Sequence, residues 1–234
     1  MKKRILSILL LCCMVLTMLP TTVLAADGPM DTIPKYDVSI DVYNRTSDIS
    51  IKDSRSYYIY SSVPDKLRDT WAWDKKIFIK GDKTAPHVFI DGVNIKMSPS
   101  SKGPAIELNK KASAYLYFIG KDSTLQGADG RAAIQKNRSE GQLYVLARTG
   151  TTVTCKGGYR AAGIGGSWAI RNIGDSMFNM DMYGHGVNMH FGSQSNPDYW
   201  GGTINATGGE YGAGIGAGSW GHSGHSGNTI HGGA

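Results

Sequence analysis

Short runs of β-branched and aromatic residues dominate the hydrophobic pattern of this chain. Residues 38–42, Val-Ser-Ile-Asp-Val, alternate strictly between apolar and polar side chains, which is the pattern of a half-buried strand. Similar runs, most of them followed closely by Gly or Asp, occupy residues 49–51, 57–60, 77–79, 88–90, 93–95, 116–119, 143–146 and 151–154. Beyond residue 25 no long stretch keeps apolar residues at helical spacing, so we expect an all-β protein.

Isoleucines that follow a run of small residues recur along the chain at a regular step. They are Ile106, Ile134, Ile164 and Ile215, separated by 28, 30 and 51 residues. The last interval fits either two shorter coils or one coil with an insertion. Self-similarity at such a period predicts stacked units, none of which buries its apolar face alone.

The strand-like runs recur with the same step. Phe89, Phe118 and Val145 are 29 and 27 residues apart, which predicts that they occupy equivalent positions. One coil would then carry two or three short strands, each paired with its counterpart one coil along, as in a parallel β-helix. Inward Ile, Val and Phe would form the core, and glycines would allow tight corners.

Two glycine-rich segments are copies of each other. Residues 157–168 and 208–220 both begin with two glycines, followed by an aromatic residue within the next two positions, small residues around one isoleucine, and Ser-Trp. Aromatic residues and isoleucines recur in register within these segments, which favours ordered turns over low-complexity disorder. Residues 169–199 depart from the pattern.

Several of these motifs resemble a known family. Asp-Gly-Val-Asn-Ile at 91–95, Gly-Pro-Ala-Ile-Glu-Leu at 103–108 and the Gly-Gly-x-Tyr-Gly-Ala-Gly-Ile-Gly type of repeat resemble secreted carbohydrate-binding domain-containing proteins of Gram-positive bacteria. Those proteins are similar to a cellulose- and acidic-sugar-binding family of the pectate-lyase-like right-handed β-helix superfamily. The resemblance covers residues 36–234 and implies a right-handed parallel β-helix that binds carbohydrate.

The first 25 residues have the organisation of a secretory signal peptide. A basic segment, Met1–Arg4, precedes the apolar stretch 5–19, and small residues allow cleavage after Ala25. The apolar stretch is too short for a comfortable membrane span. We therefore expect a signal peptide at 1–25, a linker with N-terminal capping strands at 26–86, and glycine-rich β-helix repeats at 87–234. We expect the mature chain to be secreted or associated with the cell surface, without insertion into a membrane.

Removal of this prefix changes the charge and the cysteine count. It takes three basic residues from the total of 25, which leaves 22 against 19 acidic residues and a net charge of +3. Nucleic-acid binding then loses its main support. Only Cys155 remains, so no internal disulfide can form and we expect Cys155 to point into the core.

The C-terminal end carries the start of another repeat. Thr-Ile-His-Gly-Gly at 229–233 resembles the segment 203–209, and no polar cap follows it. Either the sequence is a truncated piece of a longer protein, or the uncapped coil docks end to end against a partner.

Aromatic residues beside the glycine-rich turns are the candidate carbohydrate-binding site. We expect Tyr159 and Tyr211 in one register, Trp168 and Trp220 in another, and Trp200 just before the last full coil. Equivalent positions in a coiled stack lie about 5 Å apart per coil, so the rings would line one edge and stack on pyranose faces. The alternative is that these rings cover glycine backbone and pack the corners.

A second aromatic pair, Trp71 and Trp73, is two residues apart, so on a strand both rings would face one way. Exposed, the pair would be a small sugar-stacking surface. Buried, it would plug the N-terminal end of the solenoid, which is the interpretation we favour.

Catalytic and metal sites have weaker support. The Gly184-His185-Gly186 triplet resembles one in polygalacturonases, but the accompanying carboxylates, Arg and Lys are missing at workable spacing, and glycoside hydrolysis uses two positioned carboxylates. A lyase would need a base beside clustered carboxylates that bind calcium, whereas Asp122, Asp129 and Glu140 are scattered. His222 and His225 have ligand-like spacing in a Gly-Ser-His loop. We expect no cofactor, with calcium left open and the metal site unknown.

Taken together, these features predict a secreted or cell-surface, non-catalytic module that binds a polysaccharide or cell-surface glycan. A polysaccharide lyase or glycoside hydrolase of β-helix fold is the alternative. A structural adhesin repeat that binds a host protein is a further one.

Overall fold

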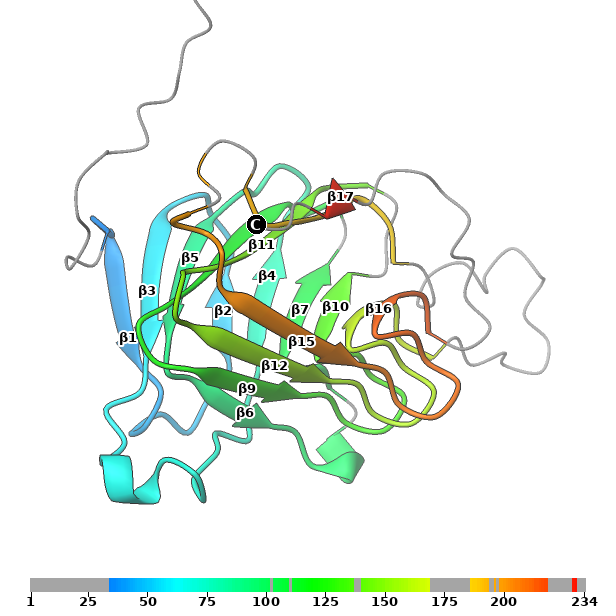
Figure 1. The fold of residues 1–234 in the computed structure, drawn as a ribbon, viewed down its shortest axis with the longest axis horizontal. Helices are drawn as coiled ribbons and strands as arrows, with labels where there is room; N and C mark the ends of the chain where they lie inside the picture. The colour runs from blue at the N-terminus through cyan, green and yellow to red at the C-terminus, as the bar shows by residue number, and fades with distance from the viewer. Residues whose placement is uncertain are drawn as a thin grey trace, which may run out of the picture. The chain divides into compact units, whose positions relative to one another are not determined.

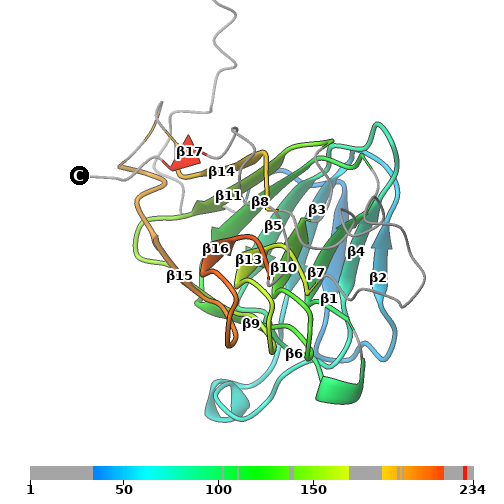
Figure 2. The ribbon, with the colours of Figure 1, turned by 90° about the vertical axis from the view of Figure 1, so that its right-hand side faces the viewer.

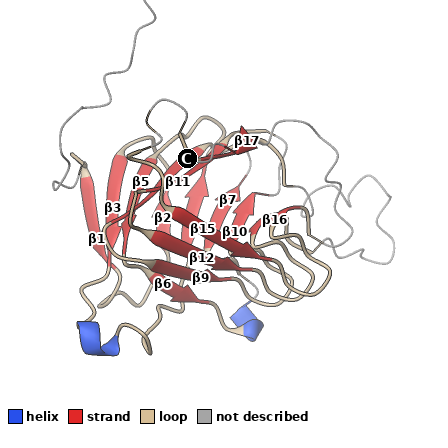
Figure 3. Ribbon diagram, viewed as in Figure 1, coloured by secondary structure: helices blue, strands red, loops and turns tan. Residues whose placement is uncertain are grey.

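The strands wind around a common axis and form three parallel sheets (Figure 1). The computed structural model describes residues 34–101, 103–109, 111–136, 140–168, 186–193, 196, 198–218 and 229–230. Residues 35–234 form one unit. Within the described part, helix is limited to two short 3-10 turns, η1 (Asp65–Leu67) and η2 (Pro99–Ser101), drawn in blue in Figure 3. The expected all-β fold is confirmed.

The three sheets are named A, B and C. Sheet A contains β1 (Val38–Asp41), β3 (Ser56–Tyr60), β5 (His87–Asp91), β8 (Ala114–Ile119), β11 (Leu143–Ala147), β14 (Met189–Phe191) and β17 (Thr229–Ile230). Sheet B contains β2 (Ile49–Ile51), β4 (Ile77–Lys80), β7 (Ile106–Asn109), β10 (Ile134–Lys136), β13 (Ile164–Gly165) and β16 (Ile215–Gly216). Sheet C contains β6 (Asn94–Lys96), β9 (Ser123–Gln126), β12 (Thr152–Lys156) and β15 (Thr203–Thr207).

The chain visits sheets A, C and B in turn, which makes a parallel β-helix. Its complete coils are β5–β7, β8–β10, β11–β13 and β14–β16. The earlier strands β1 to β4 add to sheets A and B with the same parallel pairing, and Trp73 bridges to Ile95 at the start of sheet C. The opening strands therefore begin the solenoid itself.

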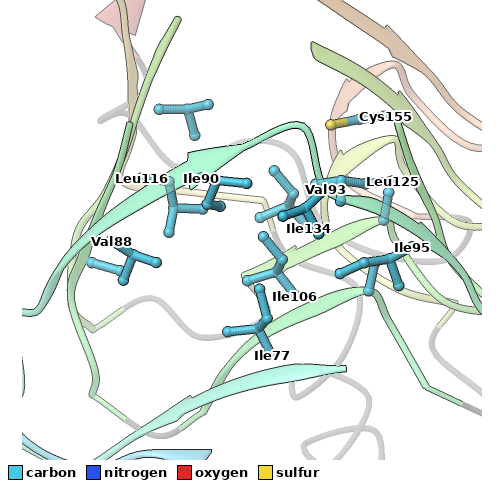
Figure 4. Packing of buried hydrophobic residues seen from close by; sticks show 14 of the residues in the cluster. Ile77, Val88, Ile90, Val93, Ile95, Ile106, Leu116, Leu125, Ile134 and Cys155 are labelled. Carbon is cyan, nitrogen blue, oxygen red and sulfur yellow. The ribbon is translucent and has the colours of Figure 1, made fainter. Parts of the chain in front are cut away.

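The predicted isoleucine ladder is present in sheet B. Ile106 pairs with Ile134, Ile134 with Ile164, and Ile164 with Ile215. The ladder also extends backwards through Ile77, and Figure 4 shows Ile77, Ile106 and Ile134 one beside the next. The interval of 51 residues is one coil with an insertion, because β14 pairs with β11 and β15 pairs with β12.

The predicted equivalence of Phe89, Phe118 and Val145 is wrong. In sheet A, Phe89 pairs with Tyr117, and Phe118 pairs with Ile90 and Ala147. Phe118 points inward and is fully buried, whereas Phe89 packs in a small outer cluster. Successive side chains of a strand point to opposite faces, so an offset of one residue exchanges the inner and outer positions.

Apolar side chains from all three sheets meet inside the coils. In sheet C the inward row is Ile95, Leu125 and Cys155, each at most 1% exposed. Cys155 is a free, buried thiol, as expected, and burial raises the pKa of the thiol. It therefore behaves as a small apolar core residue. Within the described residues no helix is long and apolar enough to cross a membrane.

Successive backbones come close together at the corner between sheets C and B. Figure 2 shows these turns following one another along the stack. A methyl group at Gly158 would overlap the carbonyl oxygen of Ala128, and one at Gly209 would overlap the carbonyl oxygen of Gly158. The paired glycines of the repeat are thus explained by backbone packed directly on backbone.

Candidate functional sites

Three of the predicted aromatic residues meet at one corner of the solenoid, around an arginine. The guanidinium carbon of Arg160 lies 5.0 Å from the ring centre of Tyr159, 5.1 Å from that of Trp168 and 5.7 Å from that of Tyr211. Tyr159 and Trp168 meet edge to face with ring centres 6.1 Å apart. We call these four residues the Arg160 corner. Its cation–π contacts were not predicted from the sequence.

Tyr159 and Tyr211 do not share a register, contrary to the prediction. Ile164 pairs with Ile215, and Tyr159 lies five residues before the first whereas Tyr211 lies four before the second. Tyr211 is therefore the counterpart of Arg160, and Glu210 is the counterpart of Tyr159, as the hydrogen bond from Arg160 N to Glu210 O (3.0 Å) also indicates. The rings are neighbours, but they form no ladder.

Trp200 belongs to a different surface. Its ring centre lies 5.2 Å from that of Tyr117 on the outer face of sheet A, and it packs against the small cluster of Tyr58, Phe89 and Ile119. The predicted site residues thus divide between two surfaces. Trp220, His185, His222 and His225 lie outside the described residues.

An aromatic ladder on the outer face of sheet A was missed by the sequence analysis. His87, Tyr115, Tyr144 and His190 occupy one register on successive strands. Their ring centres are 4.6, 4.5 and 4.6 Å apart, with nearly parallel planes. Each inner ring uses both faces on its neighbours, so the ladder presents ring edges and polar atoms to a ligand and leaves little ring face for a sugar.

Hydrogen bonds fix the polar atoms of this face. His87 Nδ1 lies 3.0 Å from the Tyr117 hydroxyl, and burial lowers the pKa of His87. The Tyr58 hydroxyl donates to Asp91 Oδ2 at 2.8 Å, and burial together with this bond raises the pKa of Tyr58. These contacts hold His87 of the ladder, and Tyr58 and Tyr117 beside it, in fixed positions.

A cavity with an aromatic wall lies on the outer face of sheet C. It has a volume of about 290 Å³, and the segment Asp69–Ala72 forms its wall. The floor consists of Asn94, Ile95 and Lys96 from β6, and Thr124 and Gln126 from β9. We call this cavity the Trp71 groove, because the half-buried ring of Trp71 lines it.

Polar rows continue from the groove along sheet C. The registers place Lys96, Gln126, Lys156 and Thr207 in one row, and Asn94, Thr124, Thr154 and Asn205 in another. Within the described part of the chain, the side chains of Lys96, Thr124 and Gln126 make no hydrogen bond, which leaves their polar atoms open to a ligand. Neighbouring members of each row are about 4.8 Å apart.

The wall of the groove is tied to the coils behind it. Arg68 donates to Gly92 O at 3.1 Å, and Asn94 Nδ2 donates to Arg68 O at 3.0 Å. Lys121 Nζ lies 2.8 Å from Asp65 Oδ1 at the start of the wall segment. Trp71 meets Tyr43 edge to face with ring centres 5.3 Å apart. The ring is thus held in place without a ligand.

Trp73 differs from Trp71. It is 3% exposed, and its indole Nε1 donates to Arg45 O at 2.8 Å. Trp73 therefore plugs the start of sheet C, whereas Trp71 packs partly against the core and also lines the groove. The signal that could have located the groove is the polar–apolar–polar pattern repeated at 94–96, 124–126 and 154–156.

Charged groups limit the chemistry of the groove. Its lining contains one carboxyl group, that of Asp69, whereas hydrolysis of a glycosidic bond uses two. Among the residues that the structure describes, no three His, Cys, Asp or Glu side chains group together as a metal site. The groove thus combines an aromatic wall with a polar floor.

Comparison of the chain with protein-family models, with curated proteins and with solved structures finds no match.

Proposed function

We propose that this protein is a secreted or cell-surface, non-catalytic β-helix that binds a polysaccharide in the Trp71 groove. The observation that carries the proposal is the position of the Trp71 ring beside the open polar groups of Lys96, Thr124 and Gln126. A pyranose has an apolar face, which stacks on an aromatic ring, and a rim of hydroxyl groups, which need hydrogen-bond partners. The groove offers both.

The rows on sheet C favour an extended ligand. Lys, Gln and Thr recur at the same position on β6, β9, β12 and β15, so the polar surface continues past the groove without a change of geometry. A polymer laid along this face would meet equivalent hydrogen-bonding groups at each coil. The secreted location rests on the signal-like residues 1–25, and the resemblance of the repeats to secreted carbohydrate-binding proteins points to the same function.

Retention on insoluble glycans tests the proposal. Cellulose, chitin and peptidoglycan would be incubated with the wild-type protein, with Trp71→Ala, and with a Lys96→Ala/Gln126→Ala double variant. We expect the wild-type protein to be retained on at least one of these glycans. Both variants should bind roughly tenfold more weakly, and Trp71→Phe should recover binding. Unfolding temperatures would show that the variants remain folded.

Trp168→Ala is the matched control, because it removes an indole ring from the Arg160 corner. Retention that is lost in Trp168→Ala and kept in Trp71→Ala would overturn the proposal for the groove and favour the Arg160 corner as the main site. Release of new reducing or unsaturated ends would favour the lyase or hydrolase. Binding to a host protein with no glycan retention would favour the adhesin.

A further inference from the structure

The backbone at the Arg160 corner is held in a conformation that side chains other than Gly rarely adopt. Gly130, Arg160 and Tyr211 occupy the same position in three successive coils, with φ values of 72°, 59° and 63°. Glycine fills this position in the first of them without strain. Arg and Tyr in the left-handed region cost free energy, and such strained residues concentrate at functional sites.

Among the residues that the structure describes, the side-chain donors of Arg160 form no hydrogen bond. Its Nε is buried and has no hydrogen-bond partner, and among the described residues its guanidinium forms no ion pair. The rings of Tyr159, Trp168 and Tyr211 pack against it and hold its position. A guanidinium fixed in this way is pre-organised to bind an oxyanion in a bidentate manner.

Two carboxylates flank the corner on the neighbouring coils. Asp129 and Glu210 occupy the position of Tyr159 one coil before and one coil after it, and both are exposed and without an ion pair in the described part of the chain. Both carboxylates would repel the additional negative charges of a polyanion, so a polyanion is disfavoured here. A ligand with one oxyanion and a neighbouring cation is matched to this arrangement instead.

We propose that the Arg160 corner is a second binding site, for a zwitterionic sugar residue that carries one carboxylate and one ammonium group. The carboxylate pairs with the Arg160 guanidinium and the ammonium with Glu210. The apolar face of the sugar ring lies on Tyr211, which is 70% exposed. The choice of a sugar as the carrier rests on the proposed function, whereas the pairing of charges rests on the corner alone.

Nuclear magnetic resonance titration of the full chain with three small sugars tests this site. Muramic acid carries both charges, N-acetylmuramic acid carries only the carboxylate, and glucosamine carries only the ammonium, at about pH 6. We expect muramic acid to bind most tightly and to shift the Arg160 Nε–Hε signal and the Tyr211 signals. Equal affinity for muramic and N-acetylmuramic acid would overturn the proposal.

The decisive variant is Arg160→Gly, because glycine fits this backbone position as Gly130 does. It should weaken muramic acid binding at least roughly tenfold while the unfolding temperature stays the same or rises. Glu210→Gln should reduce the affinity for muramic acid to that for N-acetylmuramic acid. Unchanged affinity in Arg160→Gly, or in Glu210→Gln, would overturn the proposal.

Two controls separate this site from the rest of the molecule. Arg55→Gln removes one positive charge at a distant, exposed position and should leave the affinity unchanged. Trp71→Ala removes the ring of the groove and should also leave muramic acid binding intact. If the groove proposal fails, the result for the Arg160 corner can therefore still be interpreted. Loss of muramic acid binding in Trp71→Ala would overturn the proposal of a separate site.

Discussion

Gly209 lies directly over the main-chain carbonyl of Gly158, so that a single added methyl group would overlap the carbonyl oxygen. The same relationship holds one coil earlier, between Gly158 and Ala128. At this corner the backbone of one coil therefore packs directly on the backbone of the next, with no side chain between them.

Gly158→Ala should therefore destabilise the protein strongly. Its methyl group meets backbone, which cannot move aside, so we expect a loss of about 3 kcal/mol or more and a fall in unfolding temperature of roughly 6–12 °C. Gly103→Ala is the matched control, because its methyl group would meet the flexible end of Met97 at 3.1 Å. Similar unfolding temperatures for the two variants would contradict the close packing.

Phe118 and Phe89 should respond differently to truncation. Phe118 is fully buried between the sheets, so Phe118→Ala should cost about 3–5 kcal/mol. Phe89 belongs to the outer cluster, and Phe89→Ala should cost clearly less. Chemical denaturation of both variants measures the difference. A larger loss for Phe89→Ala would mean that the register of sheet A is wrong.

Acid should weaken the outer face of sheet A through His87. Burial lowers the pKa of His87, so the unfolded chain takes up a proton at a higher pH than the folded chain does. Stability contributed by neutral His87 is present above the ordinary pKa of about 6.5 and is lost as the pH falls below it. Nuclear magnetic resonance should give a midpoint for His87 below this value. A midpoint at or above it would contradict the predicted burial effect.

Lys136 should make the stability depend on pH in the alkaline range. It occupies a core position beside Leu108 in sheet B, is 1% exposed, and donates to Glu140 O at 2.7 Å. Burial lowers the pKa of Lys136 to about 8, so between about pH 8 and pH 10.4 the unfolded chain holds more protons and stability rises with pH.

The Lys136→Met variant isolates this contribution. Over that pH range the free energy of unfolding of the wild type should rise relative to that of the variant by up to roughly 3 kcal/mol. Chemical denaturation at several pH values measures the difference. Parallel pH profiles for the two proteins would show that Lys136 keeps an ordinary pKa in the folded state.

The sequence predicted the stack because the isoleucines of sheet B are surrounded by small residues and are never shifted relative to one another. It misplaced Phe89, Phe118 and Val145, because sheet A carries aromatic residues on both its inner and outer faces, and a count of residues does not distinguish the two. The intervals also vary: Val88 to Leu116 is 28 residues and Leu116 to Val145 is 29.

The binding surfaces were harder to predict than the fold. Trp71 and Gln126 are far apart in the sequence. The bridge between Trp73 and Ile95 brings the wall to β6, and the pairing of β6 with β9 completes the floor. At the Arg160 corner the prediction selected Tyr159 and Tyr211 by residue type, although the shared position belongs to Arg160 and Tyr211. Residue type was preserved less well than backbone conformation.

The insertion between Ile164 and Ile215 shows how this architecture can grow. Leu143 pairs with Met189 across 46 residues of chain, while Leu143 pairs with Ala114 across 29, and both pairings are parallel. The extra residues between Ile164 and Ile215 leave the parallel pairing of β14 with β11 and of β15 with β12 in place. New loops could therefore be grafted there, to vary what the molecule recognises, without redesign of its interior.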